Sequence, residues 1–117
     1  MNEDRDILNL ARELAAAINC SAAYLDYQSV RERVSKRPEL MENLREFKKT
    51  QIAYEIKRMR DNEPADFNQE KYIGHLRAEL MLNPDTRDFL VSEGLMFDLH
   101  RQVAETLEGA CDMELFD

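Results

Sequence analysis

Two ionisable residues near the C-terminus, Glu93 and His100, are the strongest candidates for chemistry in this sequence. They are seven residues apart, so a helix would place them on one face, about two turns from each other. A carboxylate and an imidazole at that spacing could move a proton or provide two ligands for a metal ion. Because two ligands from one helix leave a metal shell incomplete, we favour a buried polar pair that fixes the register between helices.

The other histidine and the two cysteines carry weaker signals. His75 and Glu79 are four residues apart, a spacing typical of an exposed ion pair on a helix. Cys20 and Cys111 are isolated and lack the C-x-x-C spacing of a metal or redox site. The sequence contains no hydrolase motif, and its three glycines cannot form a glycine-rich phosphate loop. We therefore predict no enzymatic activity, no metal site and no cofactor.

Basic residues are concentrated between positions 31 and 60, where ten lysines and arginines accompany five glutamates. Such a segment could contact nucleic-acid phosphates. The glutamates are interleaved with the cations, however, and the whole chain has a net charge of −8. We therefore favour a helix surface braced by salt bridges, and we predict no contact with DNA. Weak binding of RNA or of a ribonucleoprotein by the basic helix 38–60 is the alternative function.

The composition is that of one globular domain. The chain has 117 residues, of which 44% are apolar and 34% charged, and these values exclude the disordered and membrane classes. No apolar run approaches the roughly 20 residues that span a bilayer, and the first ten residues lack the features of a secretion signal. We expect a single all-helical domain over residues 1–117, located in the cytoplasm, with residues 110–117 as a frayed acidic tail.

The elements that must position these residues are predicted to be five helices, with no strand. Apolar residues recur at helical spacing through the first 19 residues, and Ser21 can cap a second helix that stops before Pro38. Proline suits the first position of a helix, so the third helix is expected from Pro38 to about Arg60. The turn that follows contains Pro64 and separates the third helix from the fourth.

The last two helices also have recognisable starts. Asp66 with Gln69 three residues later resembles a capping box, which would begin the fourth helix. We expect that helix to be buried through Tyr72, Ile73, Leu76 and Leu80. The pair Asn83 and Pro84 repeats the arrangement of a cap followed by proline and begins the last helix. We expect that helix to end near Glu108, because a glycine follows.

The two longest predicted helices carry apolar residues on more than one face. In the third helix a second apolar stripe lies about a third of a turn away from the first, which consists of Leu40, Leu44, Phe47 and Tyr54. One neighbouring helix covers one face, so two stripes imply two neighbours. We predict an all-α helical bundle that is built on a long antiparallel helical hairpin and forms a homodimer. The candidate interface consists of Ile52, Ile56, Met59, Val91, Leu95 and Leu99.

Four segments taken together resemble the YlbF/YmcA family, including its YheA-like members. They are LARELAAAI, YLDYQSVRERV, the corner PEL that leads to LREFKKTQ, and NPDTRDFLVSEGLMFDLHRQVAETL. The resemblance covers nearly the whole chain. Its more distinctive positions are Phe47, Gln51, Asn83, Phe89 and Glu93. It implies a small all-helical protein whose long helices pair as an antiparallel hairpin and which dimerises.

In function, the resemblance implies a non-enzymatic regulatory adaptor. The best-known members act with partner proteins in competence, sporulation and biofilm control, and in ribonuclease-dependent mRNA processing, in Gram-positive bacteria. Those members have been associated with iron–sulfur clusters held by cysteines. Here Cys20 and Cys111 could contribute only to a cluster shared between chains, so we expect none. The expected partners are a second copy of the chain and another regulatory protein, with neither membrane nor RNA contact.

Overall fold

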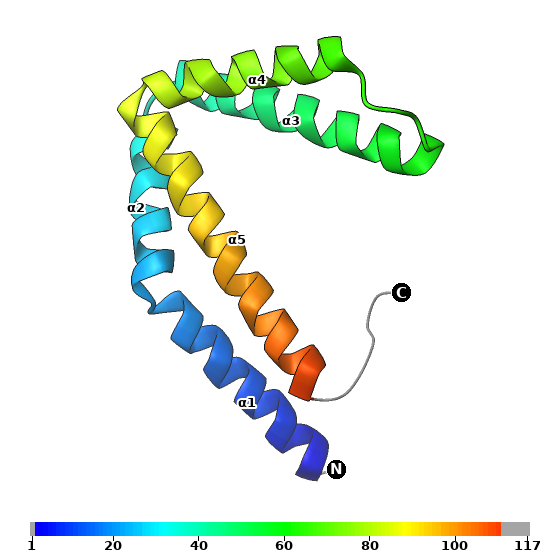
Figure 1. Cartoon of the computed structure of the whole chain (residues 1–117). Helices are drawn as coiled ribbons and strands as arrows, with labels where there is room; N and C mark the ends of the chain where they lie inside the picture. The colour runs from blue at the N-terminus through cyan, green and yellow to red at the C-terminus, as the bar shows by residue number, and fades with distance from the viewer. Residues whose placement is uncertain (1, 111–117) are drawn as a thin grey trace. The chain divides into compact units, whose positions relative to one another are not determined.

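The computed structural model describes residues 2–110, which form five α-helices and no β-strand (Figure 1). The all-α prediction is confirmed. None of these helices combines the length and the apolarity needed to cross a bilayer. The helices are α1 (Asn2–Asn19), α2 (Ala22–Ser35), α3 (Pro38–Asp61), α4 (Phe67–Leu82) and α5 (Pro84–Ala110).

Side chains that accept hydrogen bonds from free amides determine where α2 and α4 begin. The hydroxyl of Ser21 accepts from the backbone N–H of Tyr24 at 3.2 Å, at the start of α2. The carboxylate of Asp66 accepts from the backbone N–H of Gln69 at 3.1 Å, at the start of α4. Each bond satisfies an amide that has no partner within its helix. Both predicted caps are therefore confirmed, but the reciprocal bond of a capping box is not formed, because the backbone N–H of Asp66 donates to the hydroxyl of Tyr54.

The ends of α3 and α5 differ in character. After α3, Asn62 has a left-handed backbone (φ 50°, ψ 40°), which asparagine tolerates better than most residues and which ends the helix. By contrast, α5 continues through Gly109 to Ala110, so our expectation that this glycine ends the helix was wrong. Glycine ends a helix by adopting a positive φ, and Gly109 does not adopt one.

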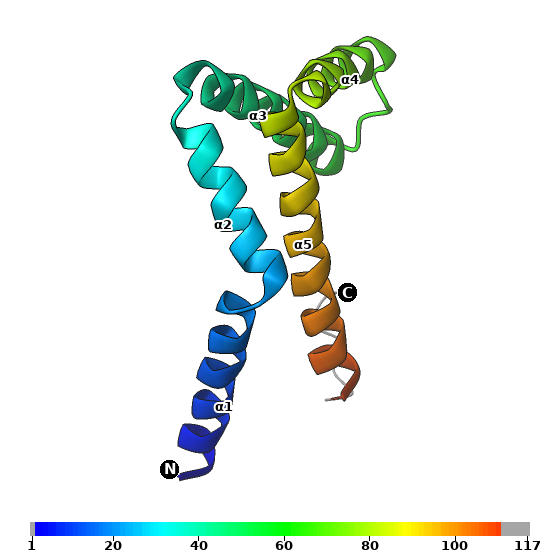
Figure 2. The ribbon, with the colours of Figure 1, turned by 90° about the vertical axis from the view of Figure 1, so that its left-hand side faces the viewer.

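The chain divides into two compact units, Val30–Leu90 and Met1–Ser29 with Val91–Asp117. The boundary falls within α2 and within α5. In the first of these units α3 and α4 lie side by side and run in opposite directions (Figures 1 and 2). The prediction of one domain over residues 1–117 remains a prediction.

The unit Val30–Leu90 contains most of the buried apolar side chains of the described residues. Val34 is fully buried, and Leu44 and Phe47 are only 3% and 2% exposed. Burying a side chain of this size stabilises the fold by about 1.5–3 kcal/mol. The unit therefore has a core of its own, to which these residues also contribute: Val30, Leu40, Leu80 and Phe89.

The other unit is much less buried. Among its described apolar residues only Met96 is buried, and α1 has no buried residue at all. Yet α1 carries Ile7, Leu10 and Leu14 within about one third of its circumference, as an amphipathic helix does. The apolar stripe of α1 is therefore largely open to solvent in a single chain.

Candidate interaction surfaces

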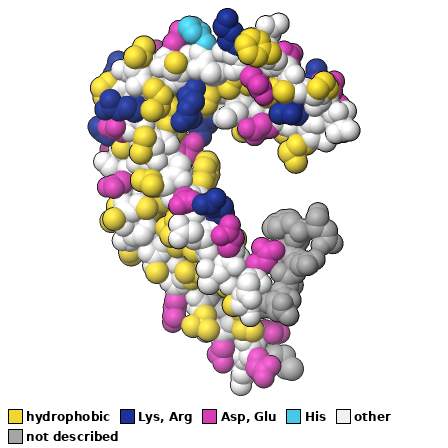
Figure 3. Space-filling model, in the orientation of Figure 1, with side chains coloured by type: hydrophobic (Ala, Val, Ile, Leu, Met, Phe, Trp, Pro, Cys, Tyr) yellow, Lys and Arg dark blue, Asp and Glu magenta, His cyan; other side chains and the backbone are white. Residues whose placement is uncertain are grey.

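The outward side of α3 is an exposed apolar surface. Ile52, Ile56 and Met59 are 54%, 51% and 83% exposed, and we call these three residues the α3 stripe. The opposite side of the same helix is buried through Leu44 and Phe47. The two apolar faces expected for this helix are thus present, and the second is exposed in the single chain. Figure 3 shows apolar side chains interrupting the charged surface on the face that it presents.

The second candidate stripe, on α5, is also accessible. Val91 and Leu95 are 53% and 57% exposed, and Leu99 is half-buried. Contiguous exposed apolar area of this kind marks sites of protein contact in soluble proteins. The assignment of both stripes to an interface between copies remains a prediction.

The structure places Glu93 and His100 differently from each other. Glu93 is half-buried, whereas His100 is exposed. Within residues 2–110, no group of three or more His, Cys, Asp or Glu side chains lies close enough to hold a metal ion. The α5 face that carries the two residues is covered at Met96 and open further along. The buried polar pair of Glu93 and His100 therefore remains a prediction.

The remaining candidates lie at the surface. Nε2 of His75 is 3.2 Å from Oε1 of Glu79, and both side chains are exposed, which confirms the expected surface pair. Cys20 is a free, exposed thiol. Cys111 lies outside the described residues, as does most of the acidic tail expected at 110–117.

Most of the cations on α3 are close to carboxylates. The separations between nitrogen and oxygen atoms lie between 3.3 and 3.9 Å. Lys48 lies over the ring of Phe89, 5.5 Å from its centroid. Partners of this kind compete with phosphates for the cations, which supports the salt-bridged surface over a nucleic-acid site. The ion pairs are Arg45–Glu42, Lys57–Glu63, Arg58–Glu70 and Arg60–Asp61.

Tyr54 fixes the end of the α3–α4 pair, a role that the sequence analysis missed. Its hydroxyl accepts from the backbone N–H of Asp66 at 2.9 Å and donates to Oε1 of Glu70 at 3.0 Å. The guanidinium of Arg58 lies over its ring at 5.8 Å. Helical spacing assigned this tyrosine to the apolar face. Spacing gives the direction of a side chain, but it does not show which groups its hydroxyl contacts.

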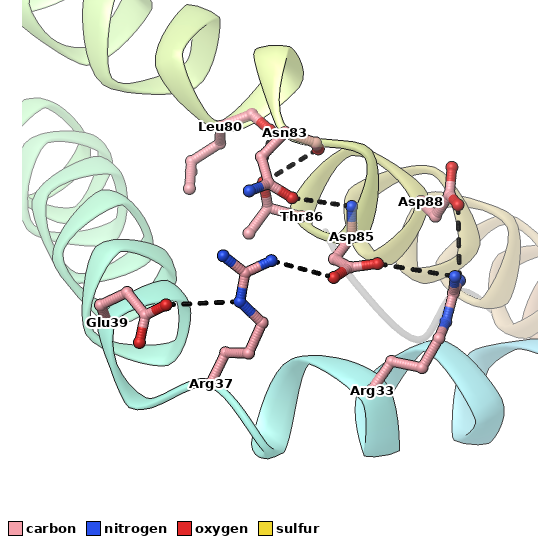
Figure 4. Close-up of polar contacts among 8 residues, drawn as sticks. All are labelled: Arg33, Arg37, Glu39, Leu80, Asn83, Asp85, Thr86 and Asp88. Carbon is pink, nitrogen blue, oxygen red and sulfur yellow. Dashed lines mark hydrogen bonds and ion pairs between the residues drawn. The ribbon is translucent and has the colours of Figure 1, made fainter.

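A charged cluster ties together the start of α3, the end of α2 and the start of α5 (Figure 4). Oδ1 of Asp85 lies 3.6 Å from Nη1 of Arg33, and its Oδ2 lies 3.3 Å from Nη1 of Arg37. Arg33 also reaches Asp88 at 3.4 Å, and Arg37 reaches Glu39 at 3.3 Å. Asp85 lies in the first turn of α5, where a negative charge is favourable. The cluster holds the ends of these three helices together, and we call it the helix joint.

Thr86 lies beneath this joint and is fully buried. Its hydroxyl donates to the backbone carbonyl of Leu80 and lies 3.2 Å from the carbonyl of Asn83. Asn83 itself accepts from the backbone N–H of Asp85 at 2.9 Å, which is the cap expected at the start of α5. The hydroxyl of Thr86 thus links the end of α4 to the start of α5.

Replacing Thr86 with valine is expected to lower the free energy of unfolding by about 1–2 kcal/mol, because a buried carbonyl loses its donor. Urea denaturation at fixed protein concentration measures the loss. Thr86→Ser keeps the hydroxyl and should retain the hydrogen bond. Thr106→Val removes an exposed hydroxyl that bonds its own helix at 2.7 Å and should change stability far less. Equal losses in the two valine variants would contradict the assigned role.

Together these features define a small all-α protein with exposed apolar helix faces of the kind used in protein–protein contacts. Ion pairs within and between helices engage many of its charged residues. The chain belongs to the YlbF/YmcA family: residues 7–110 match the family model described as "Control of competence regulator ComK, YlbF/YmcA". The family resemblance seen in the sequence is confirmed.

The chain is also similar to individual relatives. It is 26% identical over 110 residues to a UPF0342 protein of Caldicellulosiruptor saccharolyticus, covering 94% of this chain and 91% of the relative. A UPF0342 protein of Caldicellulosiruptor bescii is 26% identical over 108 residues, covering 89% and 90%. Among solved structures, a chain of Bacillus subtilis RicA in complex with RicF has a similar fold. Its TM-score is 0.60 at 22% identity, over 92% of this chain and 94% of that chain.

Proposed function

We propose that this protein is a non-enzymatic regulatory adaptor that acts through protein–protein contacts, with a second copy of itself and with another regulatory protein. The observation that carries the proposal is the uncovered apolar surface. No residue of α1 is buried, and each residue of the α3 stripe is more than half exposed. Leaving such area in water is unfavourable, and association removes it from water.

The comparisons support the same proposal. The family is described by its control of a competence regulator, and the similar solved structure contains RicA in complex with RicF. By likeness to these regulators, the process that we propose for this chain is control of competence, sporulation or mRNA processing in the cytoplasm. The proposal assigns no cofactor and no catalytic residue.

Sedimentation velocity over a wide range of protein concentration tests the contact with a second copy of the chain. We expect a dimer at micromolar concentration that dissociates on dilution. A well-folded monomer at every concentration would remove the physical basis of the adaptor. Affinity capture from the native host then tests the contact with another regulatory protein. It compares the wild type with variants in the α3 stripe that keep the fold. A partner retained by the wild type and lost by the variants is the expected result.

The alternative, RNA binding by α3, is tested by a gel shift at several salt concentrations. We expect no shift near physiological ionic strength, because the cations of α3 already have acidic neighbours. The matched variant reverses the charges of Lys48, Lys49 and Lys57. A salt-sensitive shift that the wild type shows and this variant loses would establish RNA binding in place of the adaptor.

A further inference from the structure

Two uncovered surfaces, on α1 and on α3, have the same residue spacing. On α1, Ile7, Ala11 and Leu14 stand at intervals of four and three residues, and Leu10 borders them. The α3 stripe, Ile52, Ile56 and Met59, has the same intervals. Alternation of three and four places residues at the inward positions of a two-stranded coiled coil. All six side chains are exposed in the single chain, so neither surface is covered there.

The side of α3 that packs within the chain is a different one. Leu44 and Phe47 are buried, and on the helical wheel they lie on the far side of α3 from Ile56. A helix laid along the α3 stripe would thus leave the existing α3–α4 contact in place. The stripe can accept a new neighbour without refolding of the unit Val30–Leu90.

The charges at the N-terminal ends of the two surfaces are opposite. Asp4 stands three residues before Ile7, and Glu3 is its neighbour. Lys49 stands three residues before Ile52, and Lys48 is its neighbour. On a helical wheel these four charges lie within about 60° of the stripes they precede, at 100° per residue. Acids thus border the apolar stripe of α1 where cations border that of α3.

The basic residues of α1 lie elsewhere. Arg5 and Arg12 are on the far side of the helix from the apolar stripe, about 140–160° away from Ile7. Arg12 there donates to the side-chain oxygen of Asn9 at 2.9 Å. The face of α1 that would meet a partner is therefore apolar and acidic, whereas its outer face carries the arginines.

We propose that α1 of one copy packs along the α3 stripe of a second copy, parallel and in register. Asp4 then faces Lys49, Ile7 faces Ile52, and the small Ala11 faces the large Ile56. This inference rests on the proposed function and names the faces through which two copies meet. In a twofold dimer the contact forms twice.

Pairing of like helices is disfavoured by the same charges. Two α3 helices in parallel register would set Lys49 against Lys49, and two α1 helices would set Asp4 against Asp4. Like charges placed opposite each other across an interface suppress that arrangement. Among parallel pairings between copies, therefore, the unlike pair is the one whose apolar and charged residues both match.

Disulfide trapping between two differently tagged chains tests the register. Cys20 and Cys111 are first replaced by serine. A chain carrying Ile7→Cys is then mixed with one carrying Ile52→Cys and oxidised, and we expect a disulfide between the two. The matched control pairs Leu14→Cys with Ile52→Cys, which the proposed register separates by about 10 Å along the axis and which should not join.

The two proposals fail in different ways. If sedimentation shows a dimer but neither cysteine pair joins, or both join equally, the α1–α3 contact is overturned and the adaptor stands. If no dimer forms at any concentration, the adaptor proposal fails as well. Circular dichroism of the substituted chains should show unchanged helicity, because the substituted positions are exposed.

Charge exchange provides a second, independent readout. Lys49→Glu and Asp4→Lys are each expected to weaken the dimer about tenfold, because each sets like charges opposite each other. The two changes in one chain restore the pair with its signs exchanged, so dimerisation should return to near the wild-type value. Arg5→Glu, on the outer face of α1, should leave it unchanged. Additive weakening by the two exchanges would overturn the proposed contact.

Discussion

Replacing Phe47 with alanine is expected to lower the free energy of unfolding by about 3–5 kcal/mol, the range for a large aromatic side chain removed from a packed core. Phe47 is 2% exposed and belongs to the buried face of α3. The loss includes the transfer of the ring to water and the cavity that remains. Denaturation by urea, followed by circular dichroism at matched protein concentration, measures it.

The matched control for this prediction is Phe67→Ala. Phe67 begins α4 and is 76% exposed, so the same substitution there should change stability by less than about 0.5 kcal/mol. A comparable loss at both positions would show that the core of the unit Val30–Leu90 is not where the structure places it.

Introducing a carboxylate into either candidate stripe should weaken dimerisation more than the charge exchanges do. Ile56→Glu and Leu95→Glu are each expected to weaken the dimer by at least about 100-fold, because an unpaired charge would be buried at the interface. Both residues are more than half exposed in the single chain, at 51% and 57%, so the fold should persist. Sedimentation equilibrium gives the dissociation constant.

Gln28→Glu adds the same charge at an exposed position of α2 outside both stripes and serves as the control. It should leave the dissociation constant within about twofold of the wild type, as expected for a rim or surface site. An unchanged mass for Ile56→Glu and Leu95→Glu, with helicity intact, would mean that copies associate through other faces.

The parts of the fold that could be predicted from sequence depend on local chemistry. Ser21 and Asp66 accept from amides three residues ahead, and Pro38 occupies the first position of its helix. Such interactions span less than one helical turn, so the residue types and their spacing are sufficient to locate them. The two faces of α3 were also predictable, because helical periodicity sorts residues by direction.

The parts that could not be predicted depend on contacts between residues far apart in the chain. Arg37 and Asp85 are 48 residues apart in sequence, and no local pattern relates them. Tyr72 was expected to be buried, yet it is 45% exposed, because periodicity gives a direction without showing how far the neighbouring helix extends.

The absence of any buried side chain in α1 has a consequence for the life of the protein in a cell. A helix of 18 residues is only marginally stable alone in water, so the stability of α1 would depend on packing against a partner. Newly made or surplus copies that find none are expected to fray from residue 2 onward and to be cut there by proteases first. The cellular level of the protein would then be limited by degradation of copies that have no partner.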